Sequence, residues 1–159
     1  MRILGLATCV LLAGALPAAA ANVDFSGTVT ASCSIVASTN GTLALDLATG
    51  DTLGSDETGG VAGSVTILSI GNSTLTVGAP TRTSSAPVGY VTANEVVEVS
   101  YAGASGLSAV TQAYTTSQTS RPLGTIAASV LTINNRITNT SGFPAATYTT
   151  RTVVTCAQP

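Results

Sequence analysis

A strand-like run that ends in a cysteine stands near the start of the chain, Val23-Asp24-Phe25-Ser26-Gly27-Thr28-Val29-Thr30-Ala31-Ser32-Cys33. The end of the chain holds its counterpart, Tyr148-Thr149-Thr150-Arg151-Thr152-Val153-Val154-Thr155-Cys156. Alternate residues of a strand share a face, so each run predicts a strand that ends in a cysteine on its more apolar face. If the two strands lie side by side and parallel, the cysteines meet. We therefore expect a Cys33–Cys156 disulfide between adjacent first and last strands of a β-sandwich.

An export signal precedes the first of these runs. Met1-Arg2 gives a positive start, residues 3–16 are an apolar run too short to span a bilayer, and small residues follow. We predict cleavage after Ala21, so that residues 1–21 are a signal peptide and residues 22–159 form the exported domain. Cys9 lies within the apolar run rather than at its end, which disfavours lipidation. The expected location is extracellular, at the cell surface or in the periplasm, with no transmembrane segment in the mature chain.

Composition predicts an all-β domain. The chain has no His, no Trp and no Lys, only 8% of its residues are charged, and Thr, Ser, Val, Ala and Gly dominate. Thr and Val favour strands, whereas Gly and Ser favour turns. Without Arg2, four arginines face seven acidic residues, a balance that gives no support to nucleic-acid binding. In an oxidising compartment the two mature cysteines pair and leave no free thiol.

Strand-like runs alternate with turn signals along a single domain. About eight strands are expected, in a pattern that no linker or repeat divides. Residues 48–63 and 80–87 are predicted to be loops, and residues 125–137 one long or bulged strand. Residues 64–70 and 73–77 flank Gly71-Asn72, which predicts a two-residue type II′ hairpin because Gly stands at the first turn position.

The alternation also predicts the core. The residues expected to face inward are Val29, Ala31, Leu43, Leu45, Val65, Ile67, Leu75, Val77, Val97, Val99, Leu131, Ile133, Tyr148 and Val154. A bulge or a register slip in a strand would move all of that strand's inward residues to the other face.

Both ends of the chain resemble a known family. The opening Phe25-Ser26-Gly27-Thr28-Val29-Thr30-Ala31-Ser32-Cys33-Ser34-Ile35 is similar to the start of bacterial chaperone-usher pilins and of the related spore coat U domain. The closing segments Leu131-Thr132-Ile133-Asn134-Asn135-Arg136-Ile137 and Phe143 to Thr155 are similar to the family's last two strands. The resemblance implies an immunoglobulin-like sandwich of about seven to eight strands. It also implies a secreted coat, pilus or fibre subunit whose partners are other copies of itself or related subunits, with a periplasmic chaperone and an outer-membrane usher as escorts.

Pilins lack one strand, and the N-terminal segment of a neighbour fills the gap by β-strand addition. Here the second cysteine lies at the far end of the chain, and the mature N-terminus begins almost at the first strand. We therefore expect an intramolecular disulfide to fasten the first strand to its own sandwich. The protein would then complete itself and associate through other edges or faces, strand exchange being the alternative.

The sequence offers no catalytic or cofactor-binding set, so we expect no enzyme and no cofactor. Acid–base catalysis commonly uses His, Lys or a tuned pair of carboxylates. His and Lys are absent, and the odd spacing of Glu95 and Glu98 puts them on opposite faces of a regular strand. Asp51, Asp56 and Glu57, with Asp46 nearby, are the metal candidates, because Ca²⁺ takes several oxygen ligands from a loop. Their spacing fits no known calcium loop, and a solvated loop is the favoured interpretation.

Two functions remain after these exclusions. The favoured one is a secreted structural protein that acts through β-edge or face association. The alternative is an extracellular carbohydrate-binding or matrix-associated module, which would stack sugar rings on exposed aromatic side chains. The mature chain supplies only Phe25, Tyr90, Tyr101, Tyr114, Phe143 and Tyr148 for that purpose. A cluster of exposed tyrosines on one sheet face would favour the alternative.

Overall fold

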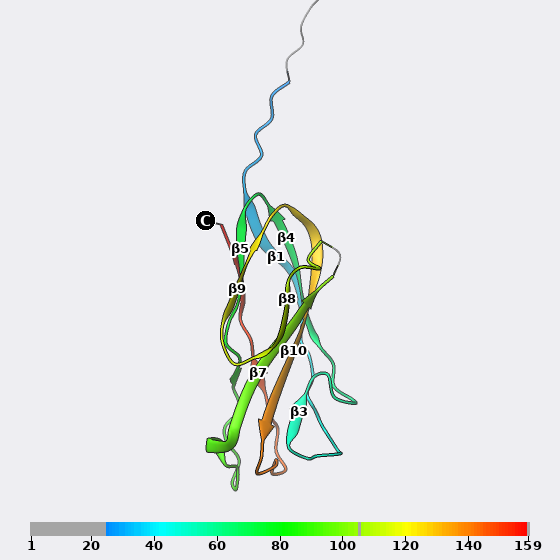
Figure 1. Cartoon of the computed structure of the whole chain (residues 1–159), viewed down its shortest axis with the longest axis vertical. Coiled ribbons are helices and arrows are strands. Elements are labelled where there is room, and N and C mark those ends of the chain that lie inside the picture. Colours follow the sequence, from blue (N-terminus) through cyan, green and yellow to red (C-terminus); the bar gives the residue numbers. More distant parts are fainter. Residues whose placement is uncertain (1–24, 105, 159) are drawn as a thin grey trace, which may run out of the picture.

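The computed structural model describes residues 25–104 and 106–158, which form an all-β sandwich (Figure 1). The predicted signal peptide and its cleavage site lie outside these residues. Twelve antiparallel strands and one short 3₁₀ turn, η1 (Thr92–Asn94), make up the described part. Several strands are only two or three residues long, which explains why the sequence pattern predicts fewer of them. In the described ranges, no helix has the length and apolar character needed to cross a membrane.

The long strand β10 (Ile126–Asn139) is the centre of the larger sheet. Its first half pairs with β4 (Gly63–Ile70), which pairs in turn with β1 (Ser32–Thr39). Its second half pairs with β3 (Thr52–Gly54), and β3 pairs with β2 (Ala44–Leu45). Along the other side of β10 lie β7 (Glu95–Gly103) and then β8 (Thr111–Thr115). The predicted long strand over residues 125–137 is therefore confirmed.

A smaller layer faces this sheet. It contains β12 (Val154–Ala157), β5 (Ser73–Val77) and β9 (Thr119–Leu123) in that order, and a two-stranded piece formed by β11 (Thr150–Arg151) and β6 (Thr81–Arg82). β3 and β6 lie within the segments that the sequence predicts to be loops.

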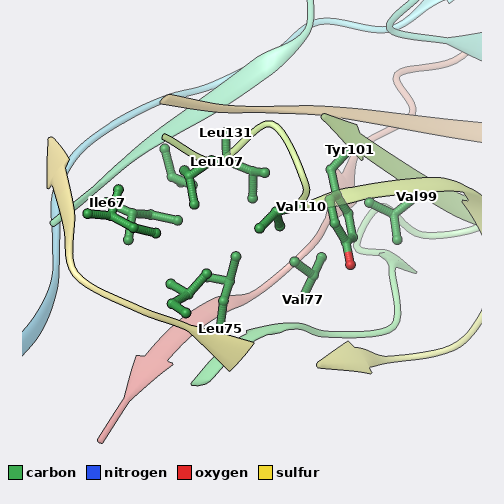
Figure 2. Close-up of a cluster of buried hydrophobic side chains, with 11 residues drawn as sticks. Ile67, Leu75, Val77, Val99, Tyr101, Leu107, Val110 and Leu131 are labelled. Carbon is green, nitrogen blue, oxygen red and sulfur yellow. The ribbon is translucent and has the colours of Figure 1, made fainter. Parts of the chain in front are cut away.

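The hydrophobic core lies between the two layers. In Figure 2, Leu75 and Val77 of the smaller layer point toward Ile67, Leu131 and Tyr101 of the larger sheet. Of the predicted core residues, six are buried: Val65, Ile67, Leu75, Val77, Val99 and Leu131. Six more are half-buried: Leu43, Leu45, Val97, Ile133, Tyr148 and Val154. Val29 and Ala31 are exposed, so the prediction was wrong for these two.

The core also contains two residues from a connection rather than a strand. Leu107 and Val110 are buried, in the segment that joins β7 to β8. Successive turns fold this segment inward, since Leu107 N–H donates to Ala104 O and Val110 N–H donates to Leu107 O. Gly103 makes the approach possible, because a Cβ at this position would overlap the main chain of Leu107. No periodic pattern marks these residues in the sequence.

The predicted hairpin around Gly71-Asn72 was wrong, although both of its strands and its turn are present. Gly71 has a positive φ of 79°, but β4 belongs to the larger sheet and β5 to the smaller layer. In a two-residue hairpin, Leu75 would share a face with Leu68, and the buried Ile67 would share a face with Thr76. The buried residues of β4 and those of β5 would then point to opposite faces of the hairpin. Crossing to the facing layer lets both sets enter one core.

The first strand also differs from its prediction. Residues 25–31 carry no strand, and β1 begins at Ser32, so Cys33 lies at the start of a strand instead of its end. β1 pairs with β4 and β12 pairs with β5, so the expected parallel pairing of the first and last strands was wrong. The Cys33–Cys156 disulfide itself is present and joins the two layers, with a Cα–Cα distance of 5.6 Å. The bond was expected to fasten the predicted first strand to its own sandwich, but residues 25–31 precede it and form no strand, so it does not fasten them.

Candidate functional site

One side of the sandwich presents two strand edges. β1 is the edge of the larger sheet and β12 is the edge of the smaller layer, and each has one hydrogen-bonded neighbour strand among the described residues. The disulfide joins these two edge strands near the end where β1 begins. Edge strands carry main-chain N–H and C=O groups that can pair with another chain. This side is therefore a place where the fold is open to β-strand addition.

On the opposite side of the sandwich the edge strands are β8 and β9, which a short connection and side-chain contacts join. Only residues 116–118 separate β8 of the larger sheet from β9 of the smaller layer, so the chain itself joins the two edges. Arg121 Nη2 of β9 donates to Gln112 Oε1 of β8 at 3.0 Å, and the hydroxyl groups of Tyr101 and Thr119 lie 2.7 Å apart. Pro122 removes one N–H donor from β9.

A groove of about 800 Å³ opens between the second half of β1 and the β11–β12 segment. Its apolar lining comes from both layers and consists of Ile35, Leu43, Val65, Ile133 and Val154. Tyr148 and Thr149 lie along one wall, and Thr39 to Thr42 lie along the other. Among the described residues of the lining, Arg151 is the one that carries a charge. The groove thus combines free strand edges, apolar side chains and a nearly uncharged surface.

Part of the groove lining is a polar network that connects the two layers. Asn135 Nδ2 of β10 donates to Thr150 Oγ1 at 3.0 Å, and Thr152 Oγ1 donates to Asn135 Oδ1 at 2.8 Å. Ser55 holds the same residue from the side of β3, because Asn135 N–H donates to Ser55 Oγ and Ser55 N–H donates to Asn135 O. We call the contacts between Asn135, Thr150 and Thr152 the Asn135 bridge. The sequence analysis missed it because Asn and Thr are common in this chain.

The segment of residues 25–31 extends away from the sandwich, and its last residue, Ala31, lies beside Gly71. Figure 1 shows it leading away from the start of β1 along the long axis of the molecule. Phe25 is 93% exposed and Val29 is 79% exposed. Its apolar residues Phe25, Val29 and Ala31 occupy alternate positions, with Ser26, Thr28 and Thr30 among them. Burial of apolar side chains stabilises a protein by about 25 cal/mol per Å² of surface. Leaving the apolar side chains of this alternating segment exposed is therefore unfavourable.

Three aromatic rings cluster next to the groove. The ring centroids of Tyr90, Phe143 and Tyr148 lie 5.2–6.1 Å apart, in tilted and edge-on contacts. Arg82 lies over the ring of Tyr90 at 5.1 Å and pairs with Glu95 at 2.5 Å. Burial, together with the hydrogen bond that its hydroxyl donates to Glu95, raises the pKa of Tyr90 to about 12. These rings pack on one another, so they are not a row of free platforms on a sheet face.

The other aromatic rings are placed differently. Tyr101 is buried in the core, and Arg136 covers the ring of Tyr114 at 3.9 Å while it pairs with Glu98. Glu95 and Glu98, which the sequence analysis weighed as catalytic carboxylates, thus pair with different arginines.

The four acidic residues that were weighed as metal ligands form two pairs. Thr49 Oγ1 lies 2.7 Å from Asp46 Oδ2 and 2.6 Å from Asp51 Oδ1, and these contacts hold the two carboxylates at one hydroxyl. Asp56 and Glu57 instead lie over Gly54. The Ala48 N–H lowers the pKa of Asp46, and the Thr49 hydroxyl lowers the pKa of Asp51. Across the residues described, no three His, Cys, Asp or Glu side chains form a group that could hold a metal ion.

Comparison with known proteins yielded no match to a family model, to a curated protein or to a solved structure. The functional argument therefore depends on the geometry of this chain.

Proposed function

We propose that this chain is a secreted bacterial surface protein, a coat, pilus or fibre subunit, whose copies assemble by β-strand addition. Residues 25–31 of one copy would enter the groove between β1 and β11–β12 of the next. One observation carries the proposal: a single chain contains both an unfilled groove between two strand edges and an unpaired segment with strand alternation. The resemblance of both chain ends to spore coat U domains and pilins supports the same conclusion.

The segment has the length of a strand. Seven extended residues span about 23 Å at 3.3 Å per residue, the length of a typical strand. Main-chain hydrogen bonds to the free edges would supply affinity, and pockets for alternate side chains would supply specificity. Phe25, Val29 and Ala31 would face the apolar lining, which includes Ile35 and Val154.

The positions of segment and groove favour an open polymer. The segment leaves the molecule where β1 begins, whereas the groove lies along the second half of β1. Two different surfaces would therefore meet in every contact. Head-to-tail contacts of this kind produce open filaments when the rotation between copies does not close a ring.

Assembly through a groove also requires protection before assembly. A free edge beside apolar side chains invites pairing with unrelated strands. We include in the proposal a periplasmic chaperone that occupies the groove and an outer-membrane usher that exchanges it for the next subunit. The location outside the cytoplasm is part of the same proposal.

A synthetic peptide of residues 22–31 tests the proposal. We expect it to bind the exported protein and to stop the growth of polymers, because it would fill the groove without presenting a groove of its own. A variant that lacks residues 22–31 should accept the peptide but should not polymerise alone. The matched control is the same peptide with Phe25→Ser and Val29→Ser, which keeps the main chain but loses the apolar side chains. If the peptide and its control bind equally, or if neither binds, the proposal is wrong.

One observation favours a carbohydrate ligand as a second candidate. The groove is lined by hydroxyl and amide groups beside Tyr148, as expected of a site that orients a sugar. An oligosaccharide that binds the exported protein and competes with the peptide would support this function. Binding that the peptide leaves unchanged would place the sugar elsewhere.

A further inference from the structure

An amide interrupts the apolar inward face of β10. Leu131 and Ile137 are buried, Ile133 is half-buried, and Asn135 stands between them in the same alternating series. Toward the start of β10, apolar side chains seal the two layers together. At Asn135, the facing layer presents the hydroxyl groups of Thr150 and Thr152 instead. The groove lies beside this polar interruption of the apolar face.

The Asn135 bridge leaves hydrogen-bonding capacity unused. A side-chain amide has two N–H donors and an oxygen with two lone pairs. The contacts to Thr150 and Thr152 use one donor and one lone pair. If the wall formed by β11 and β12 closed over the groove, the remaining donor and lone pair would lose contact with water or with an occupant. A buried polar group without a partner is unfavourable, so the bridge opposes closure.

The bridge also fixes the position of the groove wall. Arg151, Thr152 and Val154 belong to the wall, and Thr150 and Thr152 are held from β10 by the same side chain. Ser55 holds the main chain of Asn135 in turn. The wall is thus connected to the larger sheet at two positions: by the disulfide near one end of the groove and by the Asn135 bridge farther along it.

We infer that Asn135, Thr150 and Thr152 are positioning residues that hold the acceptor groove open, and that an apolar interior at these positions would close it. The inference rests on the proposed function. It predicts that the polar bridge keeps the groove able to bind the segment of residues 25–31, and that the free energy of unfolding is lower than with apolar residues at these positions. Replacing all members of a polar network by apolar residues of similar shape is often neutral or stabilising, whereas the function of the site is lost.

The test compares three forms of the exported protein in binding the peptide of residues 22–31. The apolar variant carries Asn135→Leu, Thr150→Val and Thr152→Val, so that no member of the bridge is left without a partner. The matched control carries Thr150→Ser and Thr152→Ser, which keeps both hydroxyl groups. We expect the apolar variant to bind about tenfold or more weakly than wild type, with an equal or higher unfolding midpoint. The serine control should bind within about twofold of wild type, since its hydrogen bonds remain.

Weaker binding without lower stability separates a positioning role from a merely structural one. Wild-type binding of the peptide together with equal binding by the apolar variant would overturn the inference and leave the proposed function intact. Failure of wild type to bind would reject both. If the apolar variant does not fold, the single variant Thr152→Val takes its place in the binding test. It removes one contact of the bridge and should weaken binding several-fold, and unchanged affinity would overturn the inference.

Discussion

Cys33 and Cys156 come from strands of different layers, and the bond between them is the covalent link across the open side of the sandwich. It joins residues separated by 123 positions in the sequence. A cross-link over so long a loop removes much of the freedom of the unfolded chain. Its place at the end of the groove also ties the two edge strands together.

Replacing both cysteines by serine should lower the free energy of unfolding by about 4 to 5 kcal/mol in the chain-entropy model. Urea unfolding of wild type and of the Cys33→Ser, Cys156→Ser variant measures the difference. Reduction of the wild-type protein should reproduce most of the loss. Peptide mapping without reductant provides the check, since free or intermolecular cysteines would contradict the structure.

Tyr90 links the aromatic cluster to the Arg82–Glu95 pair, and its titration has a consequence for stability. Its pKa in the folded protein is about 12, whereas an unfolded tyrosine titrates near 10. Between these values the unfolded chain releases a proton that the folded protein retains, so the unfolded state binds fewer protons. Tyr90 therefore does not change the free energy of unfolding with pH below about pH 10. It lowers the free energy of unfolding as the pH rises from 10 toward 12.

We expect the free energy of unfolding to fall through this alkaline range. Tyr90→Phe should flatten part of the fall, although it also removes the hydrogen bond to Glu95. Denaturant unfolding at a series of pH values measures the slope. A slope that is identical in the variant would show that Tyr90 does not account for it.

At the scale of elements, the crossing between β4 and β5 decides which side chains enter the core. Leu75 is 1% exposed, whereas Leu68 lies on the outward face of β4 and is half-buried. A hairpin would place these two leucines side by side on one face. The sandwich gives them different environments.

Leu75→Ala should therefore lower the free energy of unfolding by about 2 to 5 kcal/mol, as for a fully buried leucine. Leu68→Ala is the matched control and should cost clearly less, because it leaves no cavity between the layers. Urea unfolding of both variants gives the comparison. Equal losses would contradict the crossing.

At the scale of the whole molecule, the low charge is as important as the topology. Only 8% of the chain is charged, and Arg82 and Arg136 are already paired with glutamates. The proposed contact would join an almost uncharged groove to the segment of residues 25–31, which contains no charged side chain. Apolar burial and main-chain hydrogen bonds would drive the assembly.

Assembly should then depend only weakly on ionic strength. Screening at high salt weakens contacts between exposed charges and leaves apolar burial largely intact. We expect the affinity for a peptide of residues 25–31, which carries no charged side chain, to change by no more than about twofold between low and high sodium chloride. A steep decrease in affinity with salt would mean that charge pairing drives the contact.

Local sequence patterns determined the parts of this protein that depend on neighbouring residues. Alternating Thr and Val predicted the all-β class, and twelve of the fourteen predicted core residues are buried or half-buried, because alternation specifies which side chains share a face. The pairing of Cys33 with Cys156 also followed from the sequence, since each ends a strand-like run and Cys9 lies in the predicted signal peptide.

Only the tertiary structure decided which strands pair. Alternation does not specify the neighbour, so β5 could follow β4 into a hairpin or cross to the facing layer, and residues 25–31 could form a strand or remain free. Asn135 shows the same limit, because one asparagine in a chain rich in polar residues is unremarkable until Thr150 and Thr152 lie opposite it. The groove exists because these contacts are long-range: they join strands that no local pattern of the sequence brings together.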